Sequence, residues 1–197
     1  IDRDMPSAHQ FDHMIAAVVR PAGGYTYVDL TADLAPYGAL PPGEPGEFGL
    51  VVHPDGTGEE ITFPIDSARQ NLSRADIDGV LATDGTFHGK WTRTATGLQQ
   101  YALRSSMSLS TQMDSTEKAR ATLNIANAII QGSKGDSLQL FDGRDLSAEP
   151  KISVVVSGGK MVNDAGGTKI LSLPVRDFAV PNVVAALEAR GPRKNPI

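Results

Sequence analysis

The stretch Phe11-Asp12-His13-Met14-Ile15-Ala16-Ala17-Val18 and the stretch Tyr27-Val28-Asp29-Leu30-Thr31 decide the fold of the first part of this chain. Their β-branched and aromatic residues are typical of β-strands. Pro21 and the pair Gly23-Gly24 lie between the two stretches and indicate a turn. We therefore predict a β-hairpin over residues 11–32.

The register of this hairpin decides whether His13 and Asp29 lie together. Directly opposed residues share a face of a sheet, and a slip of one residue moves a whole strand to the other face. Pairing Arg20 with Tyr25 puts the aspartate on the face away from the histidine. Pairing Val19 with Tyr25 puts the aspartate diagonal to the histidine on the same face and leaves a loop of common length. The sequence allows both registers.

A histidine held by an aspartate is the proton-transfer part of a nucleophilic triad. The third member is not a cysteine of this chain, because the chain contains none. His9 and His13 have the spacing of a helical zinc site, but position 10 is Gln and the run that follows predicts a strand. Residues four apart on a strand lie about 13 Å apart, too far to share one metal. We therefore expect no metal there and no cofactor.

The rest of the chain predicts a β-rich unit with one main helix. Asp114 and Glu117 have the spacing of a capping box, and Gly132 marks a helix end, so we predict a helix near 114–131. Residues 180–190 fit either a strand or a short helix. Trp91 and Tyr101 are expected to pack across a hairpin. Further strands are predicted at 50–52, 75–83, 86–94, 99–109, 151–157 and 169–175. The fold class is therefore α+β, mostly antiparallel β, with a surface loop at 35–49 and a boundary near residues 64–73.

Composition limits the function classes. The 197 residues are 40% hydrophobic and 21% charged, which suits one large domain or two small ones. The net charge of -5 argues against nucleic acid or an anionic membrane as the main partner. No apolar run approaches the roughly 18 residues of a membrane-spanning helix. No signal peptide is visible, and both ends look cut, so any targeting segment of the parent would be missing from this sequence. The absence of cysteine leaves the compartment undecided.

The two opening stretches resemble the second half of the transglutaminase-like (papain-like) core. In that family a cysteine on a helix precedes a histidine at the start of one strand and an aspartate on the next. The resemblance covers residues 6–64. Val28-Asp29-Leu30-Thr31 departs from the family's usual Leu-Asp-Pro-Thr at the proline. Tyr37-Gly38-Ala39-Leu40-Pro41-Pro42 is similar to the segment after the aspartate in large bacterial transglutaminase-like proteins, whose core is flanked by β-rich domains.

The resemblance implies that residues 1–64 are the C-terminal half of a truncated transglutaminase-like core and that residues 65–197 are a β-rich flanking domain. It implies that His13 is the general base, that Asp29 orients the imidazole, and that Thr31 holds the aspartate loop. The parent would be a cysteine protease or acyltransferase acting on protein or peptide substrates. Lacking the thiol, this chain alone is expected to be inactive. An extracytoplasmic or periplasmic location is suggested by the resemblance only.

Two function classes stay open. The first is a fragment of an enzyme that carries the base and the orienting acid. The second is a non-catalytic module for protein interaction or structure, with the His13–Asp29 pair vestigial. If the chain is a cut catalytic domain, the apolar face with Phe11, Ile15 and Val19 lacks its packing partner. We then expect either a homodimer through this first unit or contacts with a remaining partner fragment. The alternative is that the two units fold against each other and hide this face.

Overall fold

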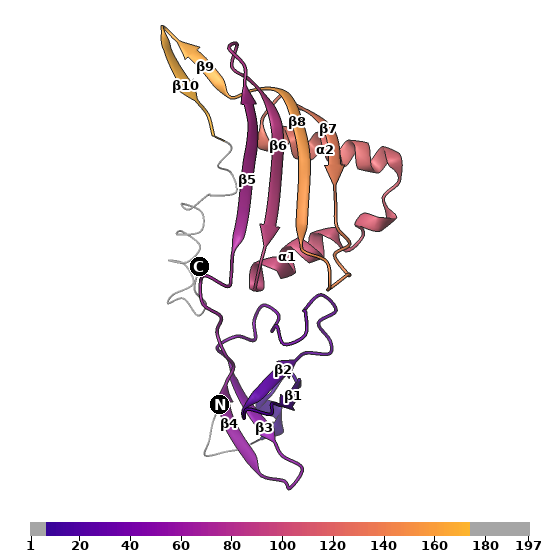
Figure 1. Cartoon of the computed structure of the whole chain (residues 1–197). Helices are drawn as coiled ribbons and strands as arrows, with labels where there is room; N and C mark the ends of the chain where they lie inside the picture. Colours follow the sequence, from indigo (N-terminus) through magenta and orange to yellow (C-terminus); the bar gives the residue numbers. More distant parts are fainter. Residues whose placement is uncertain (1–6, 174–197) are drawn as a thin grey trace.

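The computed structural model describes residues 7–173, and the fold is α+β and mostly antiparallel β (Figure 1). Residues 180–190, for which strand and helix were both open, lie outside this range. Within residues 7–173 no helix is both long and apolar enough to cross a membrane. The strands are β1 Ala16–Val19, β2 Tyr25–Val28, β3 Phe48–Val52, β4 Gly58–Thr62, β5 Ser73–Leu81, β6 Thr86–Ala95, β7 Lys134–Gln139, β8 Lys151–Lys160, β9 Val162–Ala165 and β10 Thr168–Leu171. The helices are η1 Ala8–Gln10, α1 Leu98–Met107, η2 Ser110–Gln112 and α2 Ser115–Ile129.

Two antiparallel hairpins, β1–β2 and β3–β4, form the first part of the described chain. Aromatic side chains join them. The rings of Tyr27 and Phe63 meet edge to face with centroids 5.0 Å apart, and those of Phe11 and Phe48 lie 6.3 Å apart. The Tyr25 hydroxyl donates a hydrogen bond to Glu59 across the two hairpins. Such pairs give a small layer its packing where few aliphatic residues are buried.

A four-stranded antiparallel sheet with strand order β5-β6-β8-β7 forms the second part (Figure 1). Helix α2 packs on β7 and β8, and α1 contacts β6, so both helices contribute to one core on one face of the sheet. Residues 63–72 connect the two parts without a strand or helix, and the domain division at residue 64 stays a prediction. The buried core consists of Phe87, Trp91, Ala95, Leu103, Ala126, Ile130, Leu138, Phe141, Ile152, Val154, Val156 and Met161.

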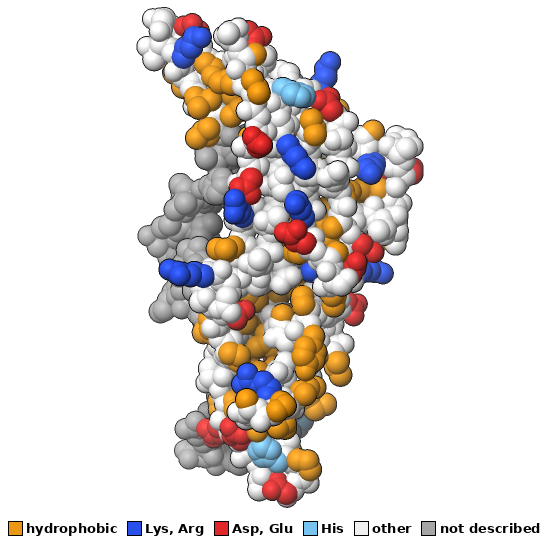
Figure 2. All heavy atoms as spheres, viewed as in Figure 1, with side chains coloured by type: hydrophobic (Ala, Val, Ile, Leu, Met, Phe, Trp, Pro, Cys, Tyr) orange, Lys and Arg blue, Asp and Glu red, His pale blue; other side chains and the backbone are white. Residues whose placement is uncertain are grey.

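The surface differs between the two parts. Figure 2 shows charged side chains of both signs interspersed over the visible face of the four-stranded sheet. It shows hydrophobic side chains gathered toward the end that holds β1–β4. Val19 and Val52 of these hairpins are 73% and 72% exposed. The first part therefore leaves apolar strand residues in contact with solvent.

The expected strand at 99–109 is wrong, because residues 98–107 form helix α1. The helix start depends on a residue far away in the sequence: the side-chain oxygen of Asn71 accepts a hydrogen bond from the Leu98 amide at 2.7 Å. The expected packing of Trp91 against Tyr101 across a hairpin is wrong for the same reason. Trp91 pairs instead with Ile77 on β5 and Val154 on β8.

The main helix and its capping box are confirmed. In α2 the Asp114 side chain accepts from the Glu117 amide at 2.8 Å, and the Glu117 side chain accepts from the Asp114 amide at 3.0 Å. The two bonds satisfy donors that a helix start otherwise leaves without partners. They fix the point at which the chain enters the helix that covers β7 and β8.

Replacing Asp114 by alanine should therefore lower the free energy of unfolding by about 1 kcal/mol, because one helix-capping acceptor is lost. Urea unfolding followed by circular dichroism measures the change. Asp136→Ala, at an exposed position of β7, is the matched control and should change stability by less than about 0.5 kcal/mol. Equal losses in the two variants would contradict the capping role.

Candidate functional site

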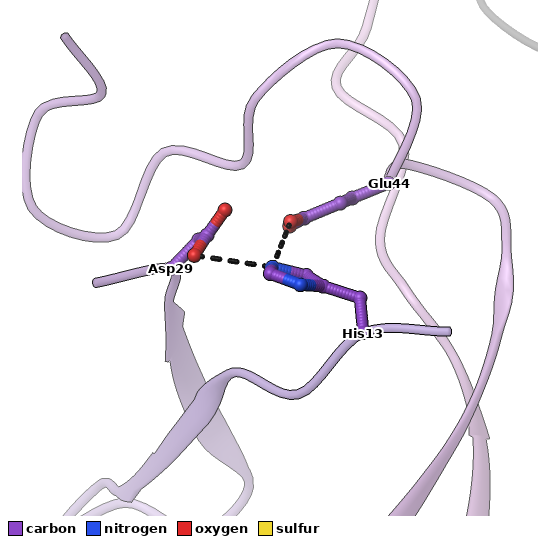
Figure 3. A group of neighbouring side chains, drawn as sticks. All are labelled: His13, Asp29 and Glu44. Carbon is purple, nitrogen blue, oxygen red and sulfur yellow. Dashed lines mark ion pairs between the residues drawn. The ribbon is translucent and has the colours of Figure 1, made fainter. Parts of the chain in front are cut away.

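Three side chains from separate segments meet beside the first hairpin (Figure 3). His13 precedes β1, Asp29 directly follows β2, and Glu44 lies in the loop before β3. His13 Nε2 lies 3.2 Å from Asp29 Oδ1 and 3.6 Å from Glu44 Oε1. The imidazole therefore faces two carboxyl groups at once, as the dashed lines of Figure 3 show.

The hairpin register brings the histidine and the aspartate together. Val19 pairs with Tyr25, which is the register that places them on one face. The turn between the strands uses Gly23 and Gly24 at positive φ, which L side chains rarely adopt. The hydrogen-bonded ladder spans only β1 and β2, so both functional side chains lie just beyond its end. The contact is present, and the catalytic role of its members stays a prediction.

Thr31 fixes the Asp29 carboxylate, as predicted. Both the amide and the hydroxyl of Thr31 donate to Asp29 Oδ1, each at 2.8 Å. The Asp29 side chain is 5% exposed. Burial favours its protonated form, but the two bonds from Thr31 and the contact with His13 outweigh burial, so the pKa of Asp29 lies below its ordinary value. This carboxylate is a charged acceptor with a fixed orientation.

Glu44 is the residue that sequence reasoning missed. It lies in the loop Pro41-Pro42-Gly43-Glu44-Pro45-Gly46, in which both glycines have positive φ. The Gly46 amide donates to the Phe63 carbonyl at 3.0 Å, which anchors the loop to the β3–β4 hairpin. A glutamate in a Pro- and Gly-rich surface loop carries no local signal of a site. Only the folded loop brings it to the histidine.

The environment of Glu44 favours its neutral form. Its side chain is 15% exposed, and its Oε2 atom is buried with no hydrogen-bond partner among residues 7–173. Burial, followed by the adjacent Asp29 carboxyl group, raises the pKa of Glu44 to about 7, although His13 opposes the shift. The two carboxyl groups therefore differ, with Asp29 ionised and Glu44 able to carry a proton near neutral pH.

The arrangement can orient an imidazole and move a proton. Both ion-pair contacts of His13 use Nε2, so its other ring nitrogen, Nδ1, takes part in neither contact. The His13 side chain is 42% exposed, so solvent or a reacting group can reach the ring. Within residues 7–173 these three residues are also the only His, Asp or Glu group of three whose ligand atoms all lie within 4.8 Å of one another. His9, in η1, is not part of it.

No family model, curated protein or solved structure matches the chain. The geometry of the three side chains is therefore what supports a function.

Folding stability should depend on the protonation of Glu44. Because folding raises the pKa of Glu44 from 4.5 to about 7, the stabilisation is complete below pH 4.5 and is lost as the pH rises through about 7. This group should therefore lower the free energy of unfolding between pH 5 and pH 8 by up to about 3 kcal/mol. Glu44→Gln keeps the shape of the side chain but removes its titratable proton. The free energy of unfolding of this variant should therefore fall less between pH 5 and pH 8.

Urea unfolding at the two pH values measures the effect. Glu149→Gln, at an exposed position, is the control and should keep the pH dependence of the unsubstituted chain. The same fall in the Glu44→Gln variant as in the unsubstituted chain would contradict a shifted pKa at this position.

Proposed function

We propose that His13 and Asp29 are the general base and the orienting carboxylate of a transglutaminase-like cysteine enzyme that transfers or hydrolyses acyl groups at peptide or glutamine amides. The observation that carries the proposal is the 3.2 Å contact between His13 Nε2 and the buried Asp29 Oδ1. A carboxylate at one imidazole nitrogen leaves the other nitrogen to act on a thiol. The resemblance of residues 6–64 to the transglutaminase-like core supports the same assignment.

The proposed reaction uses Nδ1 of His13 to accept the proton of a cysteine thiol. The thiolate attacks the amide carbonyl carbon, the C–N bond breaks, and the imidazolium returns the proton to the leaving amine. Water or a second amine then takes the acyl group from the thioester. Asp29 orients the ring and stabilises its charged form. Because the 197 residues contain no cysteine, the thiol comes from outside this sequence, and this chain alone has no such activity.

The proposal predicts which nitrogen of His13 carries the proton in the neutral ring. The Nε2–H tautomer donates to Asp29 and leaves Nδ1 unprotonated for a thiol. Nitrogen NMR of the chain with His13 in its neutral form should show this tautomer. Asp29→Asn should weaken the preference, and the exposed His88 serves as the internal control. A neutral His13 protonated on Nδ1 would overturn the proposed role.

Enzyme turnover on glutamine peptides tests the proposed function in a second way. The purified chain should neither deamidate nor crosslink glutamine peptides, and activity abolished by His13→Ala would contradict the need for an external thiol. In a polypeptide that includes both this chain and the thiol, His13→Ala should lower kcat by about 10²–10⁴-fold. His88→Ala should leave kcat unchanged.

A second proposal is that the first hairpin mediates a homodimer. The proposal rests on two exposed apolar side chains, those of Phe11 and of the strand residue Val19, which is 73% exposed. Apolar strand residues at a sheet edge favour association with another copy. This surface would serve equally in a module without catalysis, so it also favours the protein-interaction alternative.

Light scattering over a concentration series tests this association. The chain should show a mass that rises with concentration, and Val19→Lys should shift it toward the monomer. Val80→Lys is the matched control, because Val80 is an equally exposed strand valine, 71% exposed, on β5 of the other sheet. A strictly monomeric chain at high concentration would rule the homodimer out.

A further inference from the structure

The three side chains of the site have the spacing of ligands around one small cation. Nitrogen and oxygen ligands at about 2.0–2.1 Å from a tetrahedral zinc ion lie about 3.3–3.4 Å from one another. His13 Nε2 lies 3.2 Å from Asp29 Oδ1 and 3.6 Å from Glu44 Oε1. These two separations bracket the tetrahedral value, and all three ligand atoms lie within 4.8 Å of one another, so side-chain movements could bring all three groups onto one ion.

A second observation is the buried Oε2 atom of Glu44, which has no hydrogen-bond partner in the part of the chain that the structure describes. Buried polar atoms are nearly always paired, and an orphaned oxygen points to a missing ion or other partner. The orphan belongs to the carboxyl group that already faces His13 and the buried Asp29. A cation between the two carboxyl groups would offset their mutual repulsion and compensate the burial of Glu44.

The ligands are also held in place before any ion arrives. Thr31 donates two hydrogen bonds to Asp29 Oδ1 and so fixes the carboxylate. The Glu44 loop is fixed by the bond from the Gly46 amide to Phe63. A Cβ at Gly46 would lie 2.9 Å from the Ile65 side chain, so the loop packs closely at this point. Partners behind the ligands are what orient metal sites in proteins.

We propose that His13, Asp29 and Glu44 bind one divalent transition-metal cation, with zinc as the ion that fits best. An imidazole with two carboxylates suits zinc, whereas calcium and magnesium prefer sites of oxygen ligands alone. Three protein ligands leave one position on the ion, and the 42% exposed side chain of His13 gives that position access to solvent. This site goes beyond the proposed acyl chemistry and does not require it.

One consequence does rest on the proposed function. A cation on Nε2 of His13 takes the place of the hydrogen bond to Asp29. The ring then no longer has the free carboxylate that stabilises its charged form. With zinc bound, His13 and Asp29 therefore cannot act as general base and orienting carboxylate. Zinc should therefore inhibit the thiol-dependent activity of the parent, while its binding to this chain is measured without any activity.

Isothermal titration of the full 197-residue chain with zinc chloride tests the site directly. We expect one ion per chain, with binding weakened at least about tenfold by Glu44→Gln and by His13→Ala. Thr31→Val, which removes one bond to Asp29 but no ligand, should weaken binding by about tenfold. Magnesium and calcium at equal concentration should not displace zinc. Circular dichroism checks that each variant is folded.

The neighbouring hairpin offers a matched control. His53 and Glu59 also form a histidine–carboxylate pair, with Nε2 and Oε2 3.8 Å apart, and no third ligand completes it within the part of the chain that the structure describes. His53→Ala and Glu59→Gln should leave zinc binding unchanged. The proposed site would be overturned if no heat of binding were measured at millimolar zinc. It would also be overturned if Glu44→Gln left the zinc affinity unchanged, or if His53→Ala abolished zinc binding. The tautomer of His13 is unaffected by these outcomes, so the two proposals fail separately.

Discussion

The pairing of Val19 with Tyr25 is the constraint on which the site depends. The side-chain period of a strand is two, so this single pairing sets the face of every residue in the β1–β2 ladder, from whose end His13 and Asp29 extend. A shift by one residue would turn Asp29 away from His13 and separate the carboxylate from its imidazole partner. The aromatic contact of Tyr27 with Phe63 then ties the hairpin to β3–β4. That second hairpin in turn anchors the loop of Glu44 through the Phe63 carbonyl.

The site places two carboxyl groups of different character next to one imidazole. Burial favours the protonated form of both groups and is the largest cause of the raised pKa of Glu44, whereas hydrogen bonds lower the pKa of Asp29 despite its burial. Asp29 receives two hydrogen bonds from Thr31, which stabilise the ion. Glu44 has a buried oxygen that no described residue hydrogen-bonds, which destabilises the carboxylate ion. Two carboxylates in such environments titrate apart, and the one with unsatisfied atoms is the one that responds to pH or to a ligand.

The parts of this structure that the sequence predicts are those set by neighbouring residues. The capping box of Asp114 and Glu117 lies within one helical turn, and its helix is found at 115–129. The turn at Gly23-Gly24 limits the hairpin to two registers, one of which is present. The contact of His13 with Asp29 follows from that register. Helix α1 was missed because its first amide is capped by Asn71, 27 positions earlier. Glu44 was missed because its position depends on a loop that is hydrogen-bonded to Phe63, the residue directly after β4.

Proton and cation compete for the same atom, and this competition links the two proposals. Nε2 of His13 either donates its hydrogen to Asp29 or offers its lone pair to a metal, and it cannot do both. Protonation of Glu44 removes the negative charge that a cation needs, so lower pH favours the hydrogen-bonded state and higher pH the ligand set. Thr31 would have the same role in both proposed states, because its two hydrogen bonds orient Asp29 whether the carboxylate faces the imidazole or a cation. Under the two proposals, the occupant of Nε2 therefore decides whether the three side chains act as a catalytic histidine–carboxylate group or as a metal site.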